Sequence, residues 1–279
     1  MLVLLLSCND RPGLVAAAAH AIASHGGNIV DADQHTDTQH ERFLQRIEFE
    51  LPSDQEEGFR STFERISGEL EMTWSLHDTS RVPKIALLVS QEAHCLYDIL
   101  ARIELGDLQA EVGVVISNHN THASVAERFG VRFCHLPVDP NNREAQQAQV
   151  LSELLSAEIE LVALARYMQI IPDSVLAEFP DQIINIHHSF LPAFVGAQPY
   201  HRAHARGVKI IGATAHYATS DLDEGPIICQ EVTTVSHRDT VQRLIQRGRD
   251  VEQLAFAKAI RLHLERRVMS YQNRTVVFD

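Results

Sequence analysis

The sequence predicts an α/β protein of two domains. The first is a small antiparallel sandwich over residues 1–80, and the second is a mostly parallel sheet covered by helices over residues 84–279. A chain of 279 residues is long for one compact domain and comfortable for two. Strand and helix signals follow the order β-α-β-β-α-β in the first part, whereas single strands alternate with helices in the second. A polar segment that ends in proline, at 78–83, separates the two patterns.

The first domain begins with the apolar run at 2–7, which is typical of a buried central strand. This run is too short to span a bilayer, and it lacks the basic flank and cleavage site of a signal peptide. Asp10 and Pro12 predict the start of a helix, with Asp10 as its cap and Pro12 in its first turn. Gly26 and Gly27 predict the end of that helix.

The rest of the first domain completes the sandwich. Residues 28–36 and 42–51 alternate like a half-exposed hairpin, and 54–68 have the spacing of an amphipathic helix. Residues 70–77 alternate again and predict the last strand. The resulting order is that of the split βαβ, or ferredoxin-like, fold.

The segment NDRPGLV at 9–15 lies between the first strand and the first helix of this unit. In that position it resembles the corresponding segment of an ACT domain. The resemblance implies a regulatory module that binds an amino-acid effector at paired interfaces, and therefore a homo-oligomer. Pro12 and Gly13 would also serve a module without an effector, because they start a helix tightly in either case.

The second domain shows a different pattern. Near-continuous apolar strands separated by helices predict a mostly parallel, Rossmann-like sheet with helices on both faces. Strand signals occur at 84–90, 111–117, 131–135, 159–164, 182–187 and 210–217, and helix signals at 94–104, 121–129, 142–156 and 239–266.

Composition excludes several classes of protein. The net charge of −13 and the pI of about 5.6 disfavour nucleic acid as a partner. The four cysteines form no C-x-x-C pair, which indicates free thiols and a cytoplasmic location without a zinc framework.

Polar residues at the ends of two predicted strands suggest a site, because ligands of open α/β sheets bind beyond the carboxyl ends of the strands. Asn185 and His187 are two residues apart, so both side chains point to one side of an extended segment. Together they could donate to an oxygen that gains negative charge. Asp223, in an acidic loop, could act on a water or an amine. The trio suits attack on an acyl carbon.

Other interpretations of these residues remain open on chemistry alone. Polar side chains at strand ends can simply form hydrogen bonds with the main-chain groups of the neighbouring loops. A metal site is disfavoured because no H-E-x-x-H occurs and because the neighbours His187 and His188 are expected to point to opposite faces. Ser189 lies in no nucleophile elbow, and we expect it to bond the turn at Leu191. Asp221 competes with Asp223 for the carboxylate role.

The motif NIHHSFLP at 185–192, followed by DLDEGP at 221–226, resembles the formyltetrahydrofolate-dependent formyltransferase and hydrolase superfamily. The resemblance implies that Asn185, His187 and Asp223, rather than Asp221, are catalytic, and that neither a metal nor a cofactor is needed. Segment 163–172 resembles the pterin-binding loop of that family. The resulting candidates for substrate binding are Tyr167, Gln169, Ile171, Asp221 and Leu222.

The segment after the first strand of the second domain bears on the acceptor. Transferases of this superfamily that use a phosphorylated amine have a Gly-rich anion loop there, whereas this chain has SQEAHCLYDIL at 90–100, without glycine and with Glu92. Water is then the expected acceptor. The resemblance implies hydrolysis of 10-formyltetrahydrofolate to formate and tetrahydrofolate, for purine and one-carbon metabolism. The alternative is formyl transfer to a small amine.

Overall fold

The chain divides into two compact units in the computed structural model, which describes residues 1–139, 142–192 and 199–278. The first unit holds Met1–Arg81, together with 265–269 and 276–278, and the second holds Val82–Leu264 and Ser270–Thr275. The sequence placed everything after 84 in the second domain. The C-terminal residues group with the first unit because Arg46 donates to the main-chain oxygens of Glu265 and Arg266, at 3.4 and 3.2 Å.

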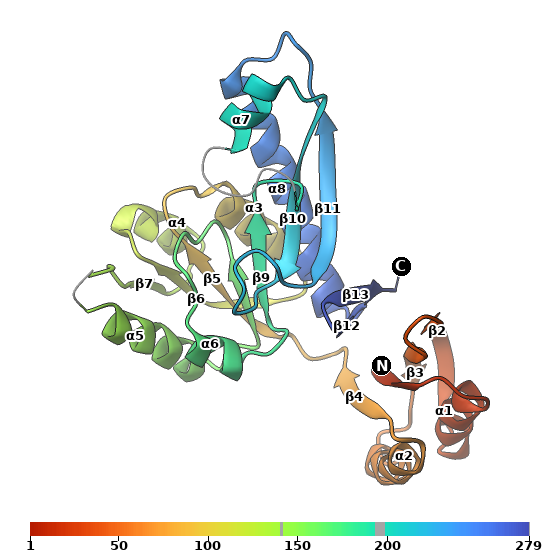
Figure 1. The fold of residues 1–279 in the computed structure, drawn as a ribbon. Coiled ribbons are helices and arrows are strands. Elements are labelled where there is room, and N and C mark those ends of the chain that lie inside the picture. Colours follow the sequence, from red (N-terminus) through yellow and green to blue (C-terminus); the bar gives the residue numbers. More distant parts are fainter. Residues whose placement is uncertain (140–141, 193–198, 279) are drawn as a thin grey trace. The chain divides into compact units, whose positions relative to one another are not determined.

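The N-terminal unit has the predicted β-α-β-β-α-β order (Figure 1). Its elements are β1 (Leu2–Asn9), α1 (Leu14–Ser24), β2 (Asn28–Asp37), β3 (Arg42–Glu50), α2 (Glu56–Leu70) and β4 (Thr73–Asp78). The sheet order is β2-β3-β1-β4. Alternate residues of the central strand β1 pack against the helices, with Phe59 and Phe63 of α2 fully buried in the same cluster. The apolar face of the amphipathic helix α2 therefore forms part of the core of this unit.

The start of α1 differs from the prediction. The helix begins at Leu14, so Pro12 lies before it, and no side chain caps it. Gly13 is the cap residue and has a φ of 96°, a left-handed conformation that favours glycine. The main-chain N–H of Asp10 is bonded to the oxygen of Glu41, so this residue takes part in strand-end pairing rather than in a helix cap.

Strand β2 is the exposed edge of this sheet. Eight of its ten residues are exposed, which is more than the half-exposed hairpin that the sequence indicated. Ile29 and Val30 are 37% and 54% exposed. Because β2 pairs only with β3 among the described strands, its other edge has unpaired main-chain groups.

The second unit is built on a seven-stranded sheet of order β11-β10-β9-β8-β5-β6-β7 (Figure 1). The strands β9 to β7 of this order are parallel, and β10 is antiparallel to both of its neighbours. The strands are β5 (Lys84–Val89), β6 (Glu111–Ser117), β7 (Phe133–His135), β8 (Leu161–Leu164), β9 (Ile183–His187), β10 (Ile210–Tyr217) and β11 (Ile227–Thr234). The predicted mostly parallel sheet is confirmed.

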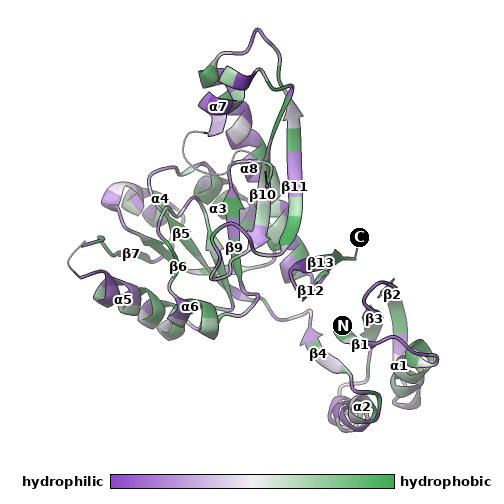
Figure 2. Cartoon of the chain, in the orientation of Figure 1, coloured by the Kyte–Doolittle hydropathy of each residue, from purple (hydrophilic) through white to green (hydrophobic). Residues whose placement is uncertain are grey.

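Helices lie on both faces of this sheet. They are α3 (His94–Glu104), α4 (Ala123–Arg128) after a short 3-10 turn (Asn120–His122), α5 (Arg143–Ser156), α6 (Asp173–Glu178), α7 (Pro199–Arg206) and α8 (Val241–Leu264). Val150 and Leu154 of α5 share a buried cluster with Ala86 and Leu88 of β5. In Figure 2 the central strands are mostly hydrophobic, while the helices alternate between hydrophobic and hydrophilic residues. This is the pattern of a sheet buried on both faces.

Several elements were not predicted. These are α6, the edge strand β11 and the C-terminal hairpin of β12 (Val268–Tyr271) and β13 (Arg274–Val277). Within the described ranges, no helix is both long and apolar enough to cross a membrane.

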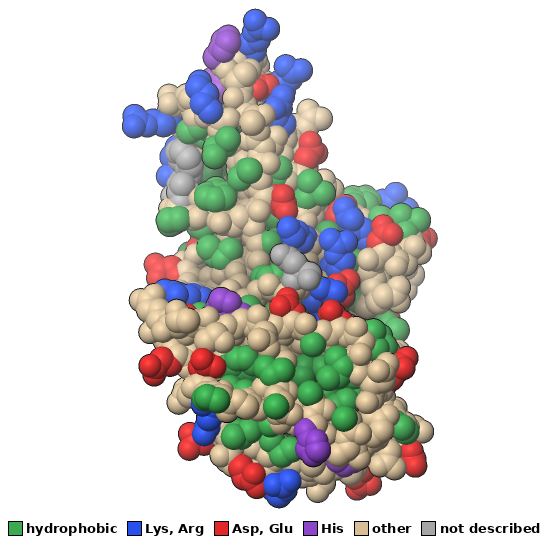
Figure 3. Space-filling view, turned by 90° about the vertical axis from the view of Figure 1, so that its right-hand side faces the viewer, with side chains coloured by type: hydrophobic (Ala, Val, Ile, Leu, Met, Phe, Trp, Pro, Cys, Tyr) green, Lys and Arg blue, Asp and Glu red, His purple; other side chains and the backbone are tan. Residues whose placement is uncertain are grey.

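Cationic side chains gather at the end of the second unit that holds α7 (Figure 3). Exposed members from α7, from the chain beside β10 and from the start of α8 are Arg202, Arg206, Lys209, Arg238 and Arg243. The sequence showed no basic run because these residues come from separate segments.

Candidate active site

A cavity of about 490 Å³ lies at the carboxyl ends of β8 and β9. Three segments line it: the chain that follows β8, the end of β9, and the loop after β10. All eight residues that the sequence proposed for the site line this cavity, namely Tyr167, Gln169, Ile171, Asn185, His187, Asp221, Leu222 and Asp223. The position agrees with the rule that ligands of such sheets bind beyond the strand ends.

His187 and Asp223 are directly paired. The Nδ1 atom of His187 donates to Oδ1 of Asp223 at 3.1 Å, with side chains that are only 8% and 14% exposed. This hydrogen bond lowers the pKa of the Asp223 carboxyl, although burial acts in the opposite direction. The Nε2 atom of His187 is buried and has no partner among the described residues. This ring nitrogen is therefore available to a ligand.

Asn185 is oriented by His216. Its Nδ2 atom lies 3.2 Å from Nε2 of His216, and Nδ1 of His216 lies 2.9 Å from the main-chain oxygen of Tyr217. His216 therefore donates through Nδ1 and accepts at Nε2. Burial lowers the pKa of His216, which favours this neutral form. The second hydrogen of the Asn185 amide bonds no other residue in the described part of the chain, so it can bond a ligand.

The loop that contains Asp223 is fixed by close packing. Asp223 has a left-handed φ of 60°. Two residues later, a Cβ atom on Gly225 would lie 1.8 Å from the main-chain oxygen of Tyr217, so only glycine fits there. Tyr217 also donates its main-chain N–H to the oxygen of Pro226 at 2.9 Å. The loop is thereby attached to β10, the neighbour of the strand that holds Asn185 and His187.

Two sequence predictions about neighbouring residues were wrong. The rings of His187 and His188 stack, with centroids 5.2 Å apart and planes at 26°, because β9 ends at His187 and the alternation stops there. The hydroxyl of Ser189 is buried without a partner among the described residues. The turn is instead held by Thr214, whose Oγ1 accepts the main-chain N–H of Leu191 at 3.0 Å.

Sequence reasoning also missed Arg166, His188 and His216, which line the cavity. His216 stands at the end of a predicted strand, which was the available signal. Burial is the main reason that the pKa of His188 falls to about 4, with the nearby Arg166 charge acting in the same direction. His188 is therefore neutral near pH 7.

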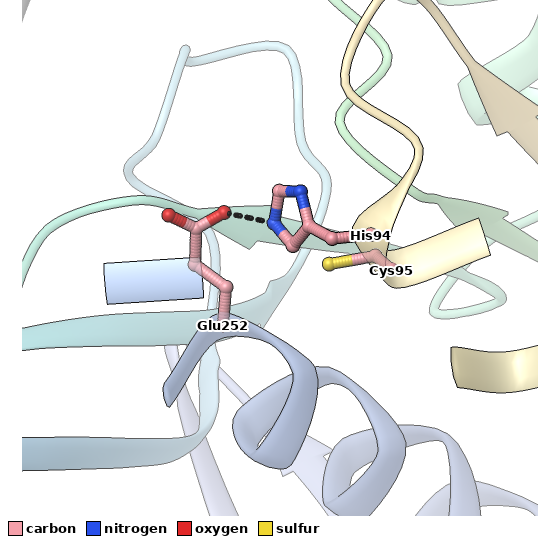
Figure 4. A group of neighbouring side chains, drawn as sticks. All are labelled: His94, Cys95 and Glu252. Carbon is pink, nitrogen blue, oxygen red and sulfur yellow. Dashed lines mark hydrogen bonds and ion pairs between the residues drawn. The ribbon is translucent and has the colours of Figure 1, made fainter. Parts of the chain in front are cut away.

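A second group of ionisable side chains, His94, Cys95 and Glu252, lies close enough together to suggest a metal (Figure 4). The chemistry of the group favours a hydrogen-bonded network instead. Burial raises the pKa of the Cys95 thiol well above its ordinary value. The two oxygens of Glu252 already accept from His94 Nε2 at 2.7 Å and from Tyr200 Oη at 2.6 Å. The Nε atom of Arg166 lies 3.5 Å from the same carboxylate, so a cation is already present.

The fold and the cavity define a class of protein that joins an ACT domain to a formyl transferase domain. Residues 2–59 match the ACT domain family and residues 83–260 match the family described as Formyl transferase.

Full-length relatives narrow this class. A formyltetrahydrofolate deformylase of Synechocystis is 50% identical over 99% of this chain and 97% of its own length, and that of Bacillus subtilis is 42% identical over 99% and 93%. The crystal structure of a formyltetrahydrofolate deformylase from Pseudomonas syringae pv. tomato superposes with a TM-score of 0.97, at 44% identity over 100% of this chain and 94% of that one. This chain belongs to the formyltetrahydrofolate deformylase family. A glycinamide ribonucleotide transformylase from Symbiobacterium toebii matches 73% of this chain and 97% of its own, with a TM-score of 0.68 and 34% identity.

Proposed function

We propose that this protein hydrolyses 10-formyltetrahydrofolate to formate and tetrahydrofolate, with Asn185, His187 and Asp223 as the reacting groups. The observation that supports this most directly is the cavity, in which an amide, an imidazole and a carboxylate from two elements converge. An acyl carbon placed between them would meet two hydrogen-bond donors and one base. This is the arrangement that acyl transfer requires.

The wall of the cavity suits a flat, largely apolar ring system. Met168, Ile170 and Leu222 line it and are 62%, 57% and 67% exposed, although large apolar side chains are usually covered. A pterin ring bound there would bury them. The main-chain groups and the amide of Gln169 would bond the polar edge of the ring. Tyr167 is buried, and its hydroxyl lies 3.4 Å from Nε2 of Gln146, so it supports this wall from behind.

The reaction needs one proton acceptor and two oxyanion donors. Asp223, ionised and held by His187, orients a water and takes one proton as the water oxygen bonds to the formyl carbon. The second N–H of the Asn185 amide and the Nε2–H of His187, protonated on both ring nitrogens, donate to the oxyanion of the tetrahedral intermediate and stabilise it. The ring-linking nitrogen then takes the proton that Asp223 holds, its bond to carbon breaks, and formic acid leaves and ionises to formate. The scheme needs no metal and no cofactor.

The segment after β5 supports water as the acceptor. Glu92 precedes α3 and its carboxylate is paired with Arg249 at 2.5 Å, so a phosphate at this helix start would have to compete with Glu92 for that arginine. The alternative is formyl transfer to a small amine, and it predicts that turnover requires an added amine.

Release of formate from the purified protein, with no amine added, tests the hydrolysis directly. We expect turnover of 10-formyltetrahydrofolate under these conditions. Turnover that begins only when an amine is supplied would support the transferase alternative. Tight binding without any turnover would indicate a folate-sensing protein instead, and would contradict the proposal.

The assignments that concern partners belong to the same proposal. A homo-oligomer is supported by the unpaired edge of β2 with its exposed Ile29 and Val30. An amino-acid effector is supported by the ACT family match at 2–59. Light scattering tests the first, and a screen of amino acids for a shift in melting temperature tests the second. The four cysteines are free, which agrees with a reducing, cytoplasmic location.

A further inference from the structure

Arg166 occupies a backbone conformation that glycine would adopt more easily. Its φ is 62°, in the left-handed region, and its main-chain oxygen accepts the N–H of Ser90 at 3.2 Å. A long charged residue at such a position is uncommon, because its Cβ makes the conformation unfavourable.

The side chain of Arg166 lies between the cavity and a buried carboxylate. It lines the cavity together with Asn185 and His187 and is only 14% exposed. Its Nε atom is 3.5 Å from Oε2 of Glu252, whose side chain is 1% exposed. Glu252 thus holds Arg166 from one side through this ion pair, while Arg166 forms part of the cavity wall beside Asn185 and His187.

Neither oxygen of Glu252 is free for a ligand. Oε2 accepts from His94 Nε2 at 2.7 Å and Oε1 accepts from Tyr200 Oη at 2.6 Å (Figure 4 shows the His94 bond). Tyr200 fits closely against α8, since a Cβ on Gly248 would lie 2.1 Å from its hydroxyl oxygen. An amine that reached this wall of the cavity would therefore meet the cation of Arg166, whose partner Glu252 is already fully bonded. Asp223, a carboxylate that also lines the cavity, already accepts from His187 at 3.1 Å.

We propose that Arg166, held in place by Glu252, determines that water rather than an amine accepts the formyl group. This inference rests on the proposed hydrolysis. In hydrolysis, a C–O bond forms, Asp223 takes a proton from a neutral water, and the C–N bond of the formyl donor breaks. In the competing reaction, the amine nitrogen bonds to the formyl carbon and is positively charged until it loses a proton. A fixed guanidinium on the cavity wall disfavours that charge.

The ratio of two products tests this. The full chain is supplied with 10-formyltetrahydrofolate and an excess of glycinamide, a small primary amine, and formate and N-formylglycinamide are both measured. From the wild type we expect formate as the main product, with a small measured amount of N-formylglycinamide that sets the reference ratio. In Arg166→Gly and Arg166→Gln, which remove the charge, we expect the ratio of formylated amine to formate to rise by about tenfold or more. Arg166→Lys, which retains the charge, should keep the wild-type ratio.

Arg266→Gly is the matched control, since Arg266 also has a left-handed φ, of 56°, but belongs to the N-terminal unit. It should leave the product ratio unchanged. An unchanged ratio in both neutral variants that still release formate would overturn the inference alone. Loss of both products in both neutral variants would also overturn it, because Arg166 would then be needed for the reaction itself. Absence of formate from the wild type would overturn the proposed hydrolysis and this inference with it.

Discussion

The Nδ1 atom of His187 lies 3.1 Å from the Oδ1 atom of Asp223, and this contact joins the end of β9 to the loop that follows β10. It gives the carboxylate a low pKa and leaves the other nitrogen of the imidazole facing a ligand site. Most of the expected behaviour of the enzyme follows from this pair and its neighbours.

Replacing the carboxylate should abolish most turnover. In Asp223→Asn, the amide cannot take a proton from water, so we expect kcat for formate release to fall by about 10²–10⁴-fold. Asp221→Asn should have a much smaller effect, because Asp221 is exposed. Asp250→Asn, on the exposed face of α8, is the control for the substitution itself. Loss of activity in Asp221→Asn together with retained activity in Asp223→Asn would assign the catalytic carboxylate to Asp221 instead.

Asn185→Ala should remove one oxyanion donor. We expect kcat to fall by about 10²–10³-fold with a small change in KM, because the donor acts mainly on the intermediate. His216 only orients this amide, at 3.2 Å, so His216→Gln should reduce kcat less. Steady-state kinetics of both variants check this order. A rise in KM with normal kcat in Asn185→Ala would show ground-state binding instead.

The pH profile should reflect the low pKa of Asp223. The ordinary value of 3.8 is lowered by the hydrogen bond from His187, so the carboxylate remains the base as the pH falls toward 3.8. We therefore expect no loss of kcat/KM from Asp223 protonation between pH 7 and about 5. His188, with a pKa of about 4, also stays neutral there. His188→Gln is a useful comparison, since its profile should keep the same acid limb.

The stability of the N-terminal unit should decrease in mild acid through His77. Burial is the main cause that lowers the pKa of His77 from 6.5 to about 4. Protons then bind the unfolded chain more readily between these two values, so the free energy of unfolding is highest above pH 6.5 and falls as the pH approaches 4. Trp74 is the single tryptophan and lies in this unit, so its fluorescence reports the transition in urea. A His77→Gln variant should show a flatter dependence, and an equal slope would contradict the assignment.

Chelation should leave the activity in place. The proposed scheme uses only side chains of the chain itself, so formate release should persist after dialysis against a strong chelator. Full loss that zinc restores would contradict the scheme. His94→Gln then tests whether the His94, Cys95 and Glu252 group is responsible, because this variant removes one ligand and keeps the size of the side chain.

Local patterns predicted most of the fold. Helix α3 begins and ends where the sequence placed it, because its apolar spacing is regular. The start of α1 was misplaced because Gly13 alone, in a left-handed conformation, ends the preceding turn. Strand β11 was missed because alternation is weak along a partly exposed edge.

The site was predictable where its residues form short motifs. These motifs pointed to Asn185, His187 and Asp223, which line one cavity, and the resemblance to a known family favoured Asp223 over Asp221. The network around Glu252 was not predictable from the sequence, because its members are far apart in the chain and meet only after folding. They are His94, Tyr200 and Glu252. The stacking of His187 on His188 depends on where β9 stops, which sequence alternation could not show.

Because Gly225 has no side chain, its loop can pack closely against β10, and this packing affects how the enzyme binds its substrate. A loop packed this tightly against Tyr217 sets the direction of Asp223 during folding, long before a folate arrives. The alignment of Asp223, the proposed base, is then independent of induced fit, and substrate analogues that lack the formyl group should encounter the same rigid geometry.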